Sequence, residues 1–224
     1  MKREIALITG AGTRVGAEIA LSLGRLGYGL VLHYNQSKPT LKESSLVHHV
    51  KADLSKGNGE KKIITYLNKK KIHVDIAIFN AANFLNGSVA LTTPSVWEQS
   101  LNVNLKANFF LSQFLINQKI KHLIFIGDQR AENPYAGKAA YLISKAGIHT
   151  LIKILAKELP KTIRVHGIAP GIVLFPKSYS PELRKKILKT AGLKKESGTQ
   201  QVVKAVLKLI KNKNIKNGKI IKVG

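Results

Sequence analysis

The 224-residue sequence contains no cysteine, one methionine and one tryptophan, and aromatic residues make up 6% of it. Without cysteine the chain forms no disulfide bond and carries no thiol nucleophile, which fits a reducing compartment. We see no apolar run of the roughly 20 residues that cross a membrane. A strand-like segment begins at residue 4, which leaves no room for a signal peptide. We therefore expect a cytoplasmic protein with no membrane partner.

Acidic residues are also scarce. The 12 Asp and Glu stand against 37 Lys and Arg, so the formal net charge is +25. The simplest interpretation is a solvated, lysine-rich surface. Steering of an anionic cofactor or partner and incidental nucleic-acid binding are the alternatives. Few aromatics accompany the charge and we recognise no nucleic-acid module, so we expect no specific nucleic-acid partner.

The seven histidines show no metal-ligand spacing except the adjacent pair His48 and His49. Neighbouring side chains of a strand point to opposite faces, so this pair is not expected to hold a metal ion.

Short apolar runs alternate with helical patterns along the whole chain, which predicts an α/β fold. We expect a single-domain, Rossmann-type, doubly wound parallel sheet of about seven strands with helices on both faces. The strands are expected near residues 4–9, 29–34, 46–50, 74–79, 122–127, 163–168 and 219–223. Helices fill most gaps, notably 95–118 and 137–158. We expect residues 1–224 to form one domain, with a nucleotide-binding half at about 1–127 and a catalytic and substrate half at about 128–224.

The first strand runs directly into the turn Gly10-Ala11-Gly12-Thr13-Arg14-Val15-Gly16, and a helical pattern follows. Strand, glycine turn and helix form the context of a dinucleotide site, because glycine lets backbone approach a pyrophosphate and the helix N-terminus offers free N–H groups. The turn has the pattern T-G-x-x-x-x-x-G, which begins at Thr9 and ends at Gly16. Arg14 lies inside this pattern, at a position where no further glycine is needed.

The end of the second strand indicates the type of cofactor. An NAD site would want an Asp or Glu there for the ribose 2′-hydroxyl, and none occurs from Tyr28 to Pro39. His33, Ser37 and Lys38 are available to a 2′-phosphate instead. This favours NADP(H), although a merely polar turn is the alternative for each residue singly.

Three residues of the second half have the spacing of a proton-transfer site. Asp128 follows an apolar strand, thirteen residues before Tyr141, and Lys145 comes four residues after Tyr141. The i, i+4 spacing puts Tyr141 and Lys145 on one helical face. A nearby ammonium lowers the pKa of a phenol, so we expect Tyr141 to be suited to proton transfer near neutral pH. A helix or loop cap is the alternative role for Asp128.

Six motifs follow one another in the order of the short-chain dehydrogenase/reductase family, which the chain resembles over nearly its whole length. They are the glycine turn, Ala52-Asp53-Leu54-Ser55, Asn80-Ala81-Ala82, Asn102-Val103-Asn104-Leu105, Tyr141…Lys145 and Pro170-Gly171. Within the family the chain is most similar to the pteridine reductases and dihydromonapterin reductases. Arg14, Phe84 and Asp128 carry this similarity, and Asp128 stands where most of the family has a catalytic serine.

The resemblance implies an NADPH-dependent oxidoreductase that reduces a dihydropterin (dihydromonapterin, dihydrobiopterin or dihydrofolate-like) by hydride transfer, with an Asp-Tyr-Lys proton relay. The implied catalytic residues are Asp128, Tyr141, Lys145 and Asn104. The implied substrate contacts are Arg14, Phe84, Asp128 and Tyr141. The implied cofactor contacts are Gly10, Gly12, Thr13, Arg14, Val15, Gly16, His33, Tyr34, Ser37, Asp53, Leu54, Asn80, Ala81, Lys145, Pro170 and Gly171. The resemblance also implies a homo-oligomer, dimer or tetramer, assembled through the helices 95–118 and 137–158, and a substrate-closing region between residues 175–180 and Ser197.

Several features depart from the family pattern. Phe79 and Ala82 replace a common asparagine and glycine, and the helix between the second and third strands is much reduced. The chain stops at Gly224, short of the usual end.

Two other functions compete with pterin reduction. The first is an NADPH-dependent carbonyl reductase such as a 3-oxoacyl carrier-protein reductase, whose acidic partner would give the basic surface a purpose. The second is a catalytically idle NADP-binding protein, against which the intact Tyr141–Lys145 pair argues.

Overall fold

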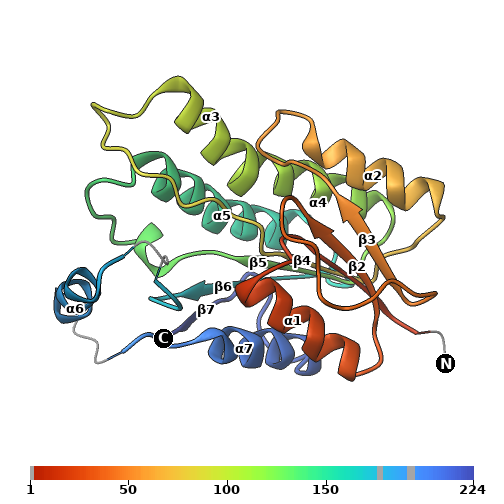
Figure 1. The fold of residues 1–224 in the computed structure, drawn as a ribbon. Helices are drawn as coiled ribbons and strands as arrows, with labels where there is room; N and C mark the ends of the chain where they lie inside the picture. Colours follow the sequence, from red (N-terminus) through yellow and green to blue (C-terminus); the bar gives the residue numbers. More distant parts are fainter. Residues whose placement is uncertain (1–2, 176–178, 191–194) are drawn as a thin grey trace.

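The computed structural model describes residues 3–175, 179–190 and 195–224. Its centre is one parallel sheet of seven strands in the order β3-β2-β1-β4-β5-β6-β7 (Figure 1). The strands are β1 (Ile5–Ile8), β2 (Gly29–Tyr34), β3 (Val47–Lys51), β4 (Ile76–Phe79), β5 (His122–Ile126), β6 (Arg164–Pro170) and β7 (Ile220–Val223). The chain winds outwards from β1 to one edge and from β4 to the other, so the predicted doubly wound, single-domain fold is confirmed. The carboxyl ends of β1 and β4 meet where the winding reverses, which is where such sheets bind ligands.

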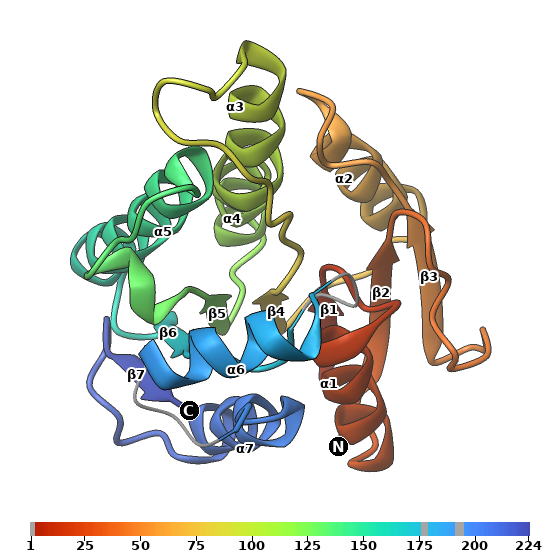
Figure 2. The ribbon, with the colours of Figure 1, turned by 60° about the vertical axis from the view of Figure 1, so that its left-hand side comes forward.

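Helices cover both faces of the sheet (Figures 1 and 2). Their bounds are α1 (Arg14–Arg25), α2 (Gly59–Lys69), α3 (Pro94–Leu101), α4 (Ala107–Asn117), α5 (Ala139–Glu158), α6 (Pro181–Thr190) and α7 (Thr199–Lys211). Leu7 of β1 belongs to the core formed with α2, α4 and α5, whereas Ile8 belongs to the core formed with α1 and α7. Because both faces are covered, the inner strands β1 and β4 are apolar throughout rather than alternating.

The central helix differs from the single helix expected over 95–118. It is divided into α3 and α4 by a π-helical turn at Asn102–Lys106. Asn104 in this turn is fully buried. Its Oδ1 accepts from the Asn83 N–H at 2.9 Å, and its Nδ2 donates to Ser144 Oγ at 3.0 Å. Such turns often occur at functional sites.

The link between β2 and β3 contains no helix in residues 35–46, where the sequence predicted a much reduced one. The expectation that no apolar run is long enough to cross a membrane was wrong. By length and composition, α5 is apolar enough to cross a membrane, although we saw no such run in the sequence. Ile148 and Ile152 of α5 are buried in the core, so α5 is a core helix of a packed domain.

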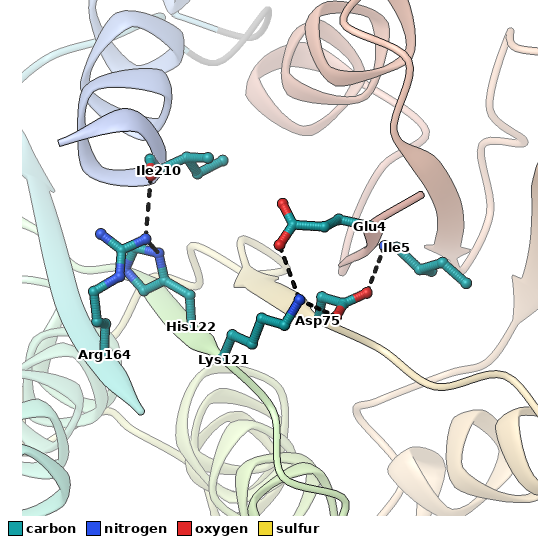
Figure 3. Close-up of polar contacts among 7 residues, drawn as sticks. All are labelled: Glu4, Ile5, Asp75, Lys121, His122, Arg164 and Ile210. Atoms are coloured by element: carbon teal, nitrogen blue, oxygen red, sulfur yellow. Dashed lines mark hydrogen bonds and ion pairs between the residues drawn. The ribbon is translucent and has the colours of Figure 1, made fainter. Parts of the chain in front are cut away.

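Polar side chains tie the amino-terminal ends of the strands together (Figure 3). Asp75 Oδ2 accepts from the Ile5 N–H at 2.9 Å, and Lys121 Nζ lies 2.9 Å from Asp75 Oδ1 and 3.1 Å from Glu4 Oε1. Burial alone would raise the pKa of Asp75, but the Ile5 N–H and the Lys121 ammonium outweigh it and lower that pKa. Asp75 therefore holds β1, β4 and β5 in register as a carboxylate.

Two buried histidines lie at the same end of the sheet. Arg164 Nη2 donates to His122 Nδ1 at 3.0 Å, and His122 Nε2 lies 2.9 Å from His166 Nδ1. His166 Nε2 in turn faces the carbonyl of Ile215 at 3.2 Å. Arginine only donates, so each imidazole accepts at Nδ1 and donates from Nε2, and both are neutral. Burial, followed by the charge of Arg164, lowers the pKa of His122 to about 2.

Candidate active site

The glycine turn closes tightly on its surroundings. Gly10 has φ +67°, and the Ala11 N–H donates to the His33 carbonyl at 2.8 Å. A Cβ added at Gly12 would collide with the Ser37 carbonyl, and one added at Gly16 would collide with the Gly10 carbonyl. Each of these glycines is therefore needed for a close approach of backbone.

Arg14 lies in the same turn with φ +52°, in the left-handed region. This corrects the expectation that the position has no need of glycine, because a side chain costs roughly 1–2 kcal/mol in that conformation. The Arg14 guanidinium donates from Nη2 to the Leu174 carbonyl at 2.5 Å. It thereby connects the turn to the segment that follows β6.

The start of α1 suits a phosphate group. The N-cap residue Thr13 makes no side-chain capping bond, and the first turn has no acidic residue. Val15 packs against the core beneath. The first N–H groups of a helix carry the positive end of its dipole, so the described residues fit the pyrophosphate of a dinucleotide.

His33 does not have the role expected for it. The ring is 2% exposed; its Nδ1 accepts from the Gly10 N–H at 3.2 Å, and its Nε2 lies 3.0 Å from the Ala52 carbonyl. Burial lowers the pKa of His33 to about 4. A neutral ring with both nitrogens bound to backbone is no phosphate ligand, so the prediction for His33 is wrong.

The other side chains near the end of β2 lie closer to the surface. Ser37 and Lys38 are exposed. The Tyr34 ring packs edge-on against His49, with centroids 6.2 Å apart.

Polar groups gather at the carboxyl ends of β3 and β4. Asp53 Oδ1 accepts from the Ser55 hydroxyl at 2.7 Å, and this bond lowers the pKa of Asp53. Leu54 beside it is buried. Asn80 Nδ2 donates to the Thr9 carbonyl at 3.0 Å, and a neighbouring amide, that of Ala81, donates to Thr9 Oγ1 at 3.0 Å. These contacts hold the ends of β1 and β4 together.

Asp128, Tyr141 and Lys145 meet as their spacing predicted. Tyr141 Oη donates to Asp128 Oδ2 at 2.5 Å, and Asp128 Oδ1 accepts from the Arg130 N–H at 2.7 Å. Asp128 thus caps a short turn as well as holding the phenol. Lys145 Nζ lies 5.8 Å from the Tyr141 ring centroid and donates to the Ile126 carbonyl at 2.8 Å.

The expected effect of Lys145 on Tyr141 is wrong. Burial, the charge of Asp128 and its hydrogen bond raise the pKa of Tyr141 well above 10.0. Burial lowers the pKa of Lys145 to about 8, against a smaller raising effect of Asp128. Tyr141 is therefore a protonated donor at neutral pH.

Among the remaining predicted residues, Phe84 contacts Tyr141, and the others contact different parts of the fold. The Phe84 ring lies edge-to-face with Tyr141, centroids 4.7 Å apart, and is 41% exposed. Asn104 reaches Ser144 rather than Tyr141. Pro170 ends β6, and the Gly171 N–H donates to the Val223 carbonyl at 2.8 Å.

The substrate-closing region predicted between residues 175–180 and Ser197 falls partly outside the described residues, because residues 176–178 and 191–194 are not among them. Its described part contains the basic helix α6 (Pro181–Thr190). The described residues include no group of three or more His, Asp or Glu side chains that could hold a metal ion.

The model of the short chain dehydrogenase family matches residues 4–183 of the chain. The chain belongs to this family. A 3-oxoacyl-[acyl-carrier-protein] reductase FabG of Buchnera aphidicola is 30% identical, with 99% of this chain and 96% of the relative covered. A sepiapterin reductase of Chlorobaculum tepidum is 26% identical, with 78% and 79% covered.

Solved structures show the same fold. A 4-hydroxyisoleucine dehydrogenase complexed with NADH matches with a TM-score of 0.88 at 22% identity, covering 99% of this chain and 97% of that one. A short chain dehydrogenase from Leptospira borgpetersenii with bound NAD⁺ matches with a TM-score of 0.86 at 20% identity, covering 100% and 92%.

Three residues of this short-chain dehydrogenase that the sequence did not predict lie beside Phe84 or Asp128 in the candidate active site. Lys138 is buried, with Nζ 3.5 Å from the centroid of the Phe84 ring. Tyr135 lies near Asp128, and burial together with that charge raises its pKa to about 12. His149 is buried four residues after Lys145, and its Nε2 accepts from the Asp128 N–H at 3.4 Å. The i, i+4 spacing of Lys145 and His149 was the signal available for His149.

Proposed function

We propose that this oxidoreductase reduces a dihydropterin (dihydromonapterin, dihydrobiopterin or dihydrofolate-like) with a nicotinamide cofactor. The observation that carries the proposal is the 2.5 Å hydrogen bond from Tyr141 to Asp128. A pterin presents ring nitrogens and an amino group that a carboxylate can engage, whereas a ketone needs only a hydroxyl donor. The Phe84 ring beside Tyr141 offers a surface for stacking of a flat ring, and Arg14 is the cation assigned to the pterin oxygen.

The cofactor supplies the hydride when bound. We assign its pyrophosphate to the N–H groups of the glycine turn and the start of α1, its adenosine side to Asp53 and Leu54, and its nicotinamide side to Lys145 and the Pro170–Gly171 segment. Asn80 and Ala81 support the turn from β4.

We further propose NADP(H) as the preferred form. The exposed Ser37 and Lys38 are the groups available to a 2′-phosphate, and no acidic residue occurs from Tyr28 to Pro39. His33 is withdrawn from this set. Because similar structures carry NADH or NAD⁺, the test below measures both cofactors.

In the proposed mechanism the proton held between Tyr141 and Asp128 is delivered to a ring nitrogen of the substrate. Lys145 stabilises the phenolate that remains and, with its pKa lowered to about 8, is suited to return a proton to it. Asn104 supports this relay from the π-helical turn by holding Asn83 and Ser144.

A 3-oxoacyl carrier-protein reductase is the second candidate. It is favoured by the FabG relative that covers 99% of the chain, and the +25 charge would attract an acidic carrier protein. The carboxylate of Asp128 has no evident purpose in that reaction.

We also propose how the molecule is organised. Residues 1–127 would hold most of the cofactor and 128–224 the catalytic and substrate groups. Large apolar side chains exposed on α3, α4 and α5 would cover one another in a cytoplasmic homodimer or tetramer. They are Trp97, Phe109, Phe110, Ile143 and Ile154.

The test is oxidation of NADPH and NADH by the purified protein with dihydropterins, dihydrofolate and a 3-oxoacyl thioester. Turnover with dihydropterins alone supports the proposal, and turnover with the thioester alone replaces it by the second candidate. Cofactor binding with no turnover of any substrate would leave an idle NADP-binding protein. Asp128→Ser is expected to shift the ratio of rates from pterin towards ketone; an unchanged ratio would show that Asp128 does not set the substrate class.

A further inference from the structure

The segment that follows β4 is bound to the start of α5. The Gly87 N–H donates to the Gly137 carbonyl at 3.0 Å, and the Ala139 N–H donates to the Gly87 carbonyl at 2.9 Å. Gly87 and Lys138 are thereby paired in a parallel bridge. The segment carrying Phe84 and the helix carrying Tyr141 are joined at this point.

Lys138 strengthens the junction from inside. Only 5% of the residue is exposed. Its Nζ donates to the Phe84 carbonyl at 3.2 Å and lies 3.5 Å from the centroid of the Phe84 ring. Among the described residues no carboxylate forms a salt bridge with it. Within residues 3–175, 179–190 and 195–224, the Phe84 carbonyl and ring face are the contacts of the Lys138 ammonium, and they compensate its buried charge.

These contacts bear on the candidate substrate site, because the Phe84 ring in turn lies edge-to-face against Tyr141 at 4.7 Å. We propose that Lys138 is a positioning residue that clamps Phe84 against Tyr141 and so makes the site selective for flat, aromatic substrates. The proposal rests on the proposed function in one respect, that Phe84 is the wall on which the substrate ring stacks. The clamp itself rests on the contacts of Lys138 with Phe84 and on the hydrogen bonds of Gly87 with Gly137 and Ala139, whichever substrate binds.

A double-mutant cycle tests the clamp through its effect on substrate. Lys138→Met removes the ammonium and keeps an unbranched apolar side chain. A lost charged hydrogen bond and a lost cation–π contact together predict a roughly 10- to 100-fold rise in KM for a dihydropterin. We expect a smaller change in kcat and an unchanged Kd for NADPH. In a Phe84→Ala background, Lys138→Met is expected to have no further effect on KM, because its action passes through Phe84.

Two further variants control the experiment. Lys157→Met removes an exposed lysine from the far end of α5 and is expected to change neither KM nor kcat. Lys138→Arg keeps a cation and is expected to recover most of the affinity for substrate. Two results would overturn the proposal. One is that Lys138→Met raises the KM for a dihydropterin as much in the Phe84→Ala background as in the wild-type background. The other is that Lys138→Met raises the Kd for NADPH by the same factor as the KM.

Hydrogen exchange separates failure of the clamp from failure of the proposed function. The amides of Gly87 and Ala139 form the junction, and Lys138→Met is expected to speed their exchange about tenfold or more, whereas Lys157→Met leaves it unchanged. Unaltered exchange would refute the clamp with any substrate. If the wild-type protein turns over no pterin, the proposed function fails, and the exchange measurement still decides the clamp. Should Lys138→Met not fold, Lys138→Gln, which keeps a donor for the Phe84 carbonyl but no charge, tests the charge alone, and it is expected to speed the same exchange by a smaller factor; unaltered exchange would refute the clamp.

Discussion

The buried pair His122 and His166 predicts how the stability of the protein falls in acid. Both rings are fully buried, and the order of their hydrogen bonds requires both to be neutral. The pKa of His122 is lowered from 6.5 to about 2. Below pH 6.5 the unfolded chain therefore binds a proton at this position that the folded protein does not bind, so acid favours unfolding. The stabilisation is complete above pH 6.5 and is lost progressively as the pH falls towards the folded pKa.

The magnitude follows from linkage. Each pH unit below 6.5 removes up to about 1.4 kcal/mol, so His122 alone lowers the free energy of unfolding by about 2 kcal/mol between pH 7.5 and pH 5. Any folded pKa below about 4 gives nearly the same value, because the folded protein is then still neutral at pH 5. The result therefore does not depend on how far the pKa is lowered.

The perturbation is His122→Gln. A glutamine amide accepts a hydrogen bond at its oxygen and donates one from its nitrogen, so it can stand between Arg164 and His166 without titrating. Urea unfolding followed by circular dichroism, at fixed protein concentration, is measured at pH 7.5, 6 and 5. The variant is expected to lose about 2 kcal/mol less than the wild-type protein over this range. Equal losses in the two proteins would refute a neutral, buried His122.

Two further predictions concern Tyr141, which donates to the Asp128 carboxylate, and Asp75, which binds the Ile5 N–H and Lys121. Tyr141→Phe is expected to lower kcat by about 10²–10⁴-fold, because it removes the proton donor, and to leave the Kd for NADPH within about twofold in a fluorescence titration; near-normal turnover would refute the assigned acid. Asp75→Asn keeps the shape of the side chain but removes the charge that faces the Ile5 N–H and Lys121. It is expected to lower the free energy of unfolding at pH 7 by about 1–3 kcal/mol, and an unchanged urea midpoint would contradict the role given to Asp75.

The strands of the sheet and the spacing of the catalytic residues could be predicted from the sequence because both depend on residues close together in the chain. Strands buried on two faces read as short apolar runs, as in residues 5–8, 76–79 and 123–126, and the turn after β1 needs glycine at fixed positions. The pairing of Tyr141 with Lys145 follows from the pitch of a helix. Asp128 could be placed because it directly follows a strand whose neighbours in the sheet were also identified.

The errors concern properties that depend on surroundings distant in the sequence. The histidine at the end of β2 was taken for a phosphate ligand, but the fold places its ring between the Gly10 N–H and the Ala52 carbonyl. The pKa of Tyr141 was expected to be lowered by a nearby lysine, but burial and a closer carboxylate act in the opposite direction. Lys138 was missed because its partner Phe84 is 54 residues away, and no sequence spacing indicates that contact.

The π-helical turn at Asn102–Lys106 has a consequence for the register of the central helix. In a regular α-helix each residue rotates the side-chain direction by about 100° around the axis. A π-helical turn holds one residue more than a regular turn. The extra residue therefore rotates the side chains of α4 by about 100° relative to those of α3. Removing one residue from the turn would give a continuous helix with a more regular hydrogen-bond ladder. It would also rotate one of the two segments away from its neighbours, so Asn104 could not face Asn83 and Ser144 while α4 kept Leu111 in the core. The geometry of the site is therefore encoded partly in chain length, and a single-residue deletion there would act as a change of helical phase.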